Sequence, residues 1–131
     1  MRKTIYTEKA PKPLAIYSQG IIVDDEITTS GQIAIDLKTG KLVEGVGEQT
    51  KLCLKYNLVI LEAGNASMSD VYQVIVYLAN INLYPPFNEE YKKFMEPYFS
   101  KGDYPVRAVS GGHDLPKGAL IEIMMRAKKV K

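Results

Sequence analysis

The stretch ALIEIMMRA, residues 119–127, predicts a strand that carries apolar side chains on both of its faces. Successive side chains of a strand point to opposite sides of a sheet. One face therefore holds three apolar side chains, those of Ile121, Ile123 and Met125. The other face holds Met124 between Glu122 and Arg126. Because both faces need cover, we expect helices on one side of the sheet and a partner subunit on the other.

Further strand candidates lie upstream of this stretch. The segments with the alternation or the turn residues of strands are 3–7, 20–23, 26–30, 31–36, a stretch ending near Ala79, and 106–110. The first four are separated by short turn signals, which indicates an antiparallel start to the sheet. A short helical turn at 67–70 precedes the strand that ends near Ala79.

Two helices are predicted among these strands. Residues 47–64 form the first, because leucines recur on one helical face before a terminal glycine: Leu54, Leu58, Leu61 and Gly64. The second contains residues 87–98, with Pro86 in its first turn and Pro97 ending or kinking it. This order of elements predicts one α+β domain, residues 1–131, with a mixed sheet whose two helices cover one face.

Composition excludes several classes of function. Lys and Arg exceed Asp and Glu by only two charges, which argues against a nucleic-acid site built on a strong basic field. A single Cys and a single His exclude an internal disulfide and a zinc finger, and we expect no metal site. We see no apolar segment typical of a signal peptide or a membrane helix, so we expect a cytoplasmic protein without membrane partners.

Two charged residues stand in otherwise apolar strand segments. Arg107 lies in the strand candidate 106–110, and Glu122 lies in the alternating stretch 119–127. A charge in such surroundings is costly unless it is paired. The residues alone favour a structural ion pair, between these two or with other groups. The alternative is a site in which Arg107 grips a substrate carboxylate while Glu122 handles protons.

The remaining reactive side chains have plainer interpretations. His113 lies in a glycine-rich segment, and we interpret it as a solvated loop residue. Cys53 falls within the first predicted helix, where a free thiol usually behaves as a small apolar side chain. The sequence therefore leaves Arg107 and Glu122 as the candidates for chemistry.

A series of short motifs runs in order from about residue 7 to residue 127. They are Ala10-Pro11, Tyr17-Ser18-Gln19, Ser30-Gly31-Gln32-Ile33, residues 36–40, Gln49-Thr50, Asn57-Leu58, residues 61–64, Asp70-Val71, Val76-Tyr77-Leu78, Phe87-Asn88-Glu89, Tyr91, Pro105-Val106-Arg107 and residues 115–123. In order and spacing, these motifs resemble the RidA/YjgF family of enamine and imine deaminases. The C-terminal motifs are the most specific.

The resemblance implies a fold, an assembly and a reaction. The fold is the one called chorismate-mutase-like, with two helices on one face of a mixed sheet. The assembly is a homotrimer with its sites between subunits. The reaction is the hydrolysis of reactive 2-enamino and 2-imino acids, such as 2-iminopropanoate and 2-iminobutanoate, to 2-keto acids and ammonia, and it requires no cofactor.

The resemblance also assigns roles to single residues. Arg107 would hold the substrate carboxylate, and Glu122 would orient the attacking water and carry its proton. The residues that would line the pocket with Arg107 are Tyr17, Ser30, Gly31, Asn88 and, through its backbone, Val109. Ordinary turn and helix-cap chemistry is the plainer interpretation of Tyr17 and Asn88, and Ser30-Gly31 could simply end a strand.

The chain departs from the family pattern at three places. Many relatives carry Cys where this chain has Val109, the usual Gly-Pro is replaced by Ala15-Ile16, and the segment Gly111-Gly112-His113 is unusual. These changes bear on substrate preference and rate more than on the class of reaction. Two alternatives stay open: a non-catalytic trimer that binds a small carboxylic acid, and an endoribonuclease. Against the endoribonuclease stand the net charge of +2 and the absence of Trp and of a basic strip.

Overall fold

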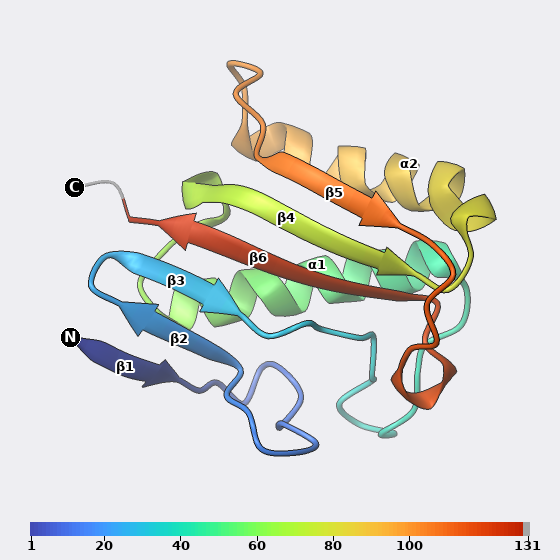
Figure 1. Cartoon of the computed structure of the whole chain (residues 1–131), viewed down its shortest axis with the longest axis horizontal. Coiled ribbons are helices and arrows are strands. Elements are labelled where there is room, and N and C mark those ends of the chain that lie inside the picture. The colour runs from blue at the N-terminus through green and yellow to red at the C-terminus, as the bar shows by residue number, and fades with distance from the viewer. Residues whose placement is uncertain (130–131) are drawn as a thin grey trace.

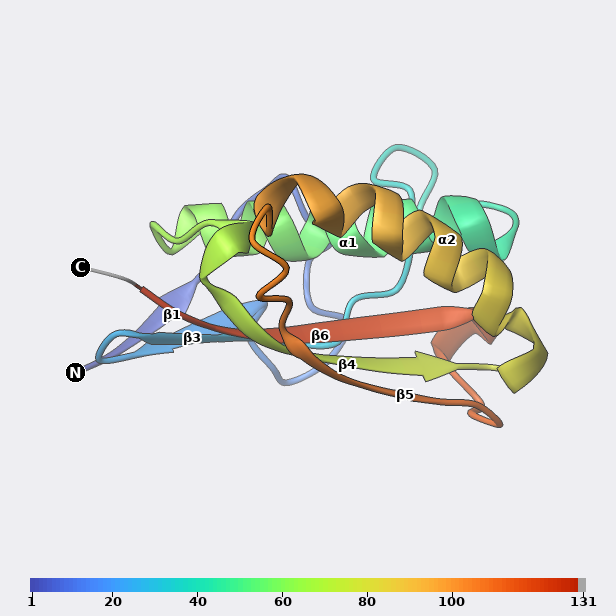
Figure 2. The ribbon, with the colours of Figure 1, turned by 90° about the horizontal axis from the view of Figure 1, so that it is seen from above.

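The computed structural model describes residues 1–129 and shows a six-stranded sheet with both helices on one face (Figures 1 and 2). The strands are β1 (Arg2–Ile5), β2 (Gly20–Val23), β3 (Glu26–Thr29), β4 (Val71–Leu78), β5 (Val106–Ser110) and β6 (Ile121–Lys128). Their order across the sheet is β1-β2-β3-β6-β4-β5. Only β4 and β5 run parallel, and the other neighbours are antiparallel. The predicted α+β class is confirmed, and residues 130 and 131 of the predicted domain lie outside the described part.

The helices are α1 (Val46–Ala63) and α2 (Tyr84–Met95). Short 3-10 turns occupy Met68–Asp70, Ile81–Leu83, Glu96–Tyr98 and Pro116–Gly118. Pro97 lies in the turn that follows α2, so it ends this helix as predicted. None of these helices has the length and apolar character that a membrane crossing requires, within residues 1–129.

The end of α1 differs from the expected glycine cap. Gly64 has an ordinary φ of −93°, and Asn65 takes the left-handed conformation with φ 63° instead. Gly64 is needed for close packing, because a Cβ there would lie 2.8 Å from Cδ1 of Ile5. Asn tolerates the left-handed region better than most residues, which explains why the turn works without a glycine at that position.

One predicted strand is absent, and another ends earlier than predicted. Residues 31–36 form no strand and contribute only two isolated bridges, Gln32 with Ile123 and Ile35 with Leu42. The first strand stops at Ile5 rather than at residue 7, because the side chain of Gln19 takes over the backbone hydrogen bonds beyond that point. Oε1 of Gln19 accepts from the Thr7 amide at 2.7 Å, and Nε2 donates to the carbonyls of Thr7, Ala10 and Pro11.

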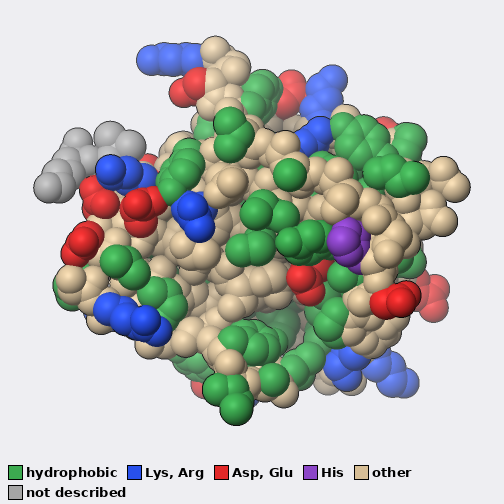
Figure 3. Space-filling model, in the orientation of Figure 1, with side chains coloured by type: hydrophobic (Ala, Val, Ile, Leu, Met, Phe, Trp, Pro, Cys, Tyr) green, Lys and Arg blue, Asp and Glu red, His purple; other side chains and the backbone are tan. Residues whose placement is uncertain are grey.

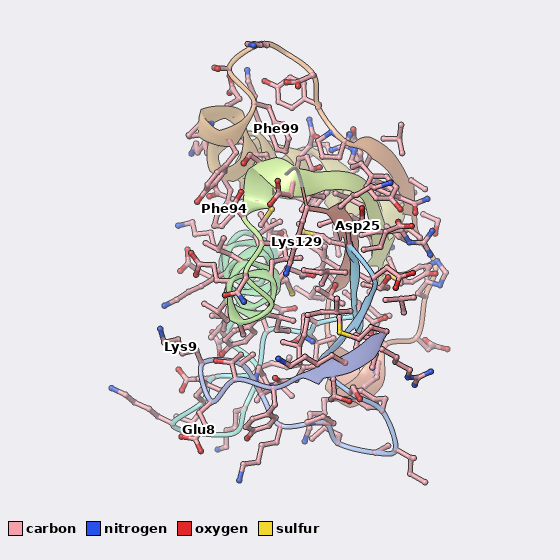
Figure 4. The ribbon with its side chains drawn as sticks, turned by 90° about the vertical axis from the view of Figure 1, so that its left-hand side faces the viewer. Glu8, Lys9, Asp25, Phe94, Phe99 and Lys129 are labelled. Atoms are coloured by element: carbon pink, nitrogen blue, oxygen red, sulfur yellow. The ribbon has the colours of Figure 1, made fainter. Side chains whose placement is uncertain are left out.

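Strand β6 lies near the middle of the sheet, and its two faces lie in different environments. Ile121, Ile123 and Met125 are fully buried beneath the helices. On the opposite face, which we call the open face, Glu122 and Met124 are half-buried. Figure 4 views the end of the molecule where β6 finishes: the Lys129 amide donates to the Asp25 carbonyl at 2.9 Å, while Phe94 and Phe99 lie on the helix side.

Asn57 of α1 ties the helix to the sheet through a buried polar network. Its Oδ1 accepts from the Thr29 hydroxyl at 2.7 Å, and its Nδ2 donates to the carbonyls of Cys53 and Ile123 at 2.9 and 3.2 Å. The Thr29 hydroxyl in turn accepts from the Met125 amide at 2.8 Å. The network therefore bonds α1, β3 and β6 to one another inside the core.

We expect Asn57→Ala to lower the free energy of unfolding by about 2–4 kcal/mol, because buried partners would lose their hydrogen bonds. Urea denaturation monitored by circular dichroism measures this change. Asn82→Ala is the matched control, because the Asn82 side chain is exposed. Equal stability of the two variants would contradict the structural role of the network.

Candidate functional site

Arg107 of β5 points toward α2 and is held there by polar and aromatic groups. Nη1 donates to Oδ1 of Asn88 at 2.7 Å, and Nη2 donates to the Tyr84 hydroxyl at 2.6 Å. The guanidinium carbon also lies 4.9–5.7 Å from the centres of three aromatic rings of α2, those of Tyr84, Phe87 and Tyr91. We call Arg107, Tyr84, Phe87, Asn88 and Tyr91 the arginine cluster.

The arginine cluster fixes a cation without neutralising it. The guanidinium has five N–H donors, so its bonds to Asn88 and Tyr84 leave three for a ligand. Arg107 is exposed, because β5 is an edge strand paired only with β4. The apolar neighbours of Arg107 in the sequence therefore do not bury it. No ion pair joins Arg107 to Glu122 or to another carboxylate within residues 1–129, so the structural ion pair that the residues alone favoured was wrong.

Glu122 lies against the loop that follows β3. A Cβ built on Gly31 would come within 2.5 Å of Oε2 of Glu122, so the carboxylate occupies the space that a side chain at 31 would need. The neighbouring Gln32 exchanges two backbone hydrogen bonds with Ile123, at 2.8 and 3.1 Å, which keeps this loop beside β6. Burial raises the pKa of Glu122, and the charge of His113 opposes this effect.

His113 lies in a loop, as expected, but it is half-buried on the open face rather than fully solvated. Its Nε2 is 2.8 Å from the Ser110 hydroxyl, and its ring packs edge-on against Tyr77 with centroids 4.7 Å apart. Tyr77 is paired with Glu122 across β4 and β6, and with Ser110 across β4 and β5. Ser110, Tyr77 and Glu122 thus form a row across the sheet, with His113 beside it.

A row of apolar residues lies next to the row of Ser110, Tyr77 and Glu122 on the same face. Ala108, Ile75 and Met124 are neighbours across β5, β4 and β6. Figure 3 shows the open face in the orientation of Figure 1, with hydrophobic side chains gathered near its middle. No segment within residues 1–129 forms a second layer over this face (Figure 2).

Tyr17 and Ser30 line a groove of about 650 Å³ beside β2 and β3. The Tyr17 hydroxyl accepts from the Leu14 amide at 3.1 Å, and the Ser30 hydroxyl donates to the Ser18 carbonyl. The tyrosine hydroxyl can still donate, and the serine hydroxyl can still accept. Ile16, next to Tyr17, is fully exposed at the lip of this groove.

Apart from Tyr17 and Ser30, which line the groove beside β2 and β3, the predicted site residues fall into two groups within one chain. Arg107, Asn88 and Val109 belong to the helix side, since Val109 lies two residues from Arg107 on β5 and packs against the core. Glu122 and Gly31 belong to the open face. One chain therefore brings Arg107 together with Asn88, and Glu122 together with Gly31, but it does not bring Arg107 to Glu122.

Sequence reasoning missed several members of both groups. The aromatic residues of the arginine cluster have a signal, because Tyr84, Phe87 and Tyr91 recur at the spacing of one helix face. Tyr77 and His113 have no such signal, since their proximity to Glu122 depends on the strand register and on the path of the loop after β5.

Comparisons with known proteins agree over nearly the whole chain. Residues 7–129 match the family model described as endoribonuclease L-PSP. A RutC family protein of Pyrococcus abyssi is 42% identical over 129 residues, covering 98% of both chains. The 2-iminobutanoate/2-iminopropanoate deaminase of Rattus norvegicus is 41% identical over 124 residues, covering 94% of this chain and 87% of that protein.

Solved structures show the same fold. The crystal structure of Escherichia coli TdcF with bound serine superposes with a TM-score of 0.91 at 30% identity, covering 98% of this chain and 99% of that one. The YjgF gene product of E. coli superposes with a TM-score of 0.88 at 32% identity, covering 98% of this chain and 99% of that one.

We expect Gly31→Ala to displace the Glu122 carboxylate while leaving the fold intact, because the side chain can rotate and the backbone bonds of Gln32 remain. Crystal structures and thermal melts of the variant measure both effects. Gly47→Ala is the control, since a Cβ there would lie 3.7 Å from its nearest neighbour, Cγ of Glu90. An unmoved Glu122 in the Gly31→Ala structure would contradict this prediction.

Proposed function

The chain belongs to the endoribonuclease L-PSP family, the RidA/YjgF proteins, and from this premise we propose that it hydrolyses 2-imino and 2-enamino acids to 2-keto acids and ammonia. The observation that carries the proposal is the arginine cluster, an oriented cation with free donors at the edge of the sheet. Small 2-imino acids present a carboxylate next to the reacting C=N bond, which suits such a cation.

Relatives support this class of substrate. The rat and human relatives, 41% and 40% identical, are named 2-iminobutanoate/2-iminopropanoate deaminases. Others at similar identity carry only the name of the RutC family. The TdcF structure holds serine, a small amino acid whose carboxylate is attached to the carbon that bears nitrogen. A 2-imino acid has the same arrangement, with the C–N single bond oxidised to a C=N double bond.

Arg107 would bind the substrate carboxylate through two of its remaining N–H groups. Asn88 and Tyr84 orient the guanidinium before the substrate arrives, so little side-chain freedom is lost on binding. The surrounding rings favour the cation. Binding at this end of the substrate would place the imine carbon at a fixed distance from the cluster, which is how orientation lowers the barrier.

Glu122 would accept the proton of the attacking water. The water oxygen adds to the imine carbon while one of its protons passes through Glu122 to the nitrogen, which gives a carbinolamine. The remaining hydroxyl proton follows by the same route to the amine, and the C–N bond breaks to release ammonia. The carbon keeps the oxygen as the carbonyl of a 2-keto acid, so the atoms balance. The raised pKa of the half-buried carboxyl group suits a residue that both takes and returns a proton.

Both roles require two chains. Arg107 lies on the helix side of the sheet and Glu122 on the open face, so a site that contains both would form where the open face of one subunit meets the β5–α2 edge of the next. The apolar row of Ala108, Ile75 and Met124 is suited to be covered in such a contact. A closed ring of three identical subunits, as the family resemblance implies, would then contain three sites.

One observation favours a second candidate function. The arginine cluster is complete within a single chain and does not depend on Glu122, so it could bind a small carboxylic acid without turnover. Calorimetric binding of 2-oxobutanoate, combined with no hydrolysis of imino acids, would favour this carboxylate-binding role.

We expect the wild-type protein to suppress semicarbazide trapping of 2-iminopropanoate generated by an amino-acid oxidase. Arg107→Ala lowers kcat/KM by about 100-fold, because two charge-assisted hydrogen bonds are lost. Arg107→Lys is the matched control that keeps the charge without the planar fork, and we expect only partial recovery. Equal suppression by wild type and Arg107→Ala would overturn the proposal.

Mixing two inactive variants tests whether the residues act across subunits. We expect Arg107→Ala and Glu122→Gln to be inactive alone, and to regain up to about a quarter of wild-type activity when refolded together. In a random mixture, about one interface in four joins an intact Arg107 to an intact Glu122. Native mass spectrometry confirms that the subunits have exchanged, because mixed assemblies have masses between those of the two pure ones. No recovery in mixed assemblies would show that one chain supplies both residues.

A further inference from the structure

His113 is fixed on the open face by three contacts. Its backbone amide donates to the Leu78 carbonyl at 3.2 Å, which places the residue at the end of β4. Its Nε2 is 2.8 Å from the Ser110 hydroxyl, and its ring lies at 65° to that of Tyr77. An imidazole with this many partners has a defined position, although it belongs to a loop rather than to a strand.

That position is beside Glu122. Directly paired residues of an antiparallel ladder bring their Cβ atoms to about 4.5–5.5 Å, and Tyr77 is the residue paired with Glu122. The ring of His113 packs on the same tyrosine. The imidazole and the carboxyl group therefore share one face, with Tyr77 next to both.

Other titratable or charged groups near this pair come from each neighbouring element. Tyr77 belongs to β4, Asp114 is exposed in the same loop as His113, and Arg126 lies four residues along β6 on the same face. Cys53 of α1 is buried on the far side of the strand, and its thiol pKa is raised by burial and by Glu122. His113 is thus the basic side chain that packs on Tyr77, the strand partner of Glu122.

We propose that His113 is a positioning residue for Glu122: its protonated imidazole keeps the half-buried carboxyl group ionised, and so able to accept a proton from water, at mildly acidic pH. The inference rests on the proposed hydrolysis and assigns to this chain a residue that sets the pH range of its reaction. Burial and the charge of His113 act in opposite directions on the pKa of Glu122, burial being the larger influence.

The pH dependence of kcat/KM tests the proposal. A group that must be ionised gives an acid limb, and removal of a nearby positive charge moves that limb to higher pH. We expect His113→Gln, which keeps a hydrogen-bonding group for Ser110, to shift the acid limb upward by roughly half a pH unit. The rate at alkaline pH should stay near that of wild type. An acid limb identical to that of wild type would overturn the proposal.

Asp114→Asn is the control for general charge effects, since it removes one charge from the same loop at an exposed position. We expect its acid limb to coincide with that of wild type. A shift as large as that of His113→Gln would show that loop charge in general, rather than His113, controls the profile.

Carbon NMR provides a test that does not need turnover. The carboxyl signal of Glu122, assigned by its loss in Glu122→Gln, reports on the ionisation of this group. Because the charge of His113 lowers the pKa of Glu122, His113→Gln should move the midpoint of this signal to higher pH in the assembled protein. An unchanged midpoint overturns the proposal even if the deaminase is active. A shifted midpoint without deaminase activity would support the coupling and count against the proposed function alone.

Discussion

The alternation of side chains in the sheet is the constraint on which the candidate site depends. Ile121 and Ile123 must face the helices, because the core is built on them, so Glu122 between them must face the other way. β5 runs beside β4 at the edge and turns Arg107 toward α2. A register slip of one residue would exchange the faces and destroy the core. The separation of cation and carboxylate within one subunit is therefore a consequence of the fold.

The two halves of the site are organised by different means. Arg107 is oriented by side chains of α2, an amide, a hydroxyl and three rings. Glu122 is placed mainly by shape, since its carboxylate fills the space left by the missing side chain of Gly31. The bridge between Gln32 and Ile123 keeps that glycine in place. Several side chains hold Arg107, so the loss of one of them leaves the others in place. The position of Glu122, in contrast, depends on the absence of a side chain at Gly31.

Local pattern predicted the helices and the central strand, because these depend on periodicity alone. Leu54 and Leu61 of α1 face the core of the protein, and β6 has one fully buried apolar face, as expected. The segment 31–36 alternates like a strand but makes only isolated bridges, because the chain turns back at Asp36, whose amide bonds to the Lys41 carbonyl. Arg107 is exposed because β5 lies at the edge of the sheet. The order of the strands cannot be predicted from composition or from the spacing of residues. The partners of Glu122 depend in the same way on register.

Gln19 has a consequence for how proteins of this kind can diverge. One buried amide anchors the segment from Thr7 to Pro11, and the chain then passes over the surface to the rim of the groove at Ile16. Mutations between that anchor and Tyr17 can accumulate without disturbing the sheet. The rim can therefore change in sequence during evolution, and related proteins can differ in substrate preference while their fold stays the same.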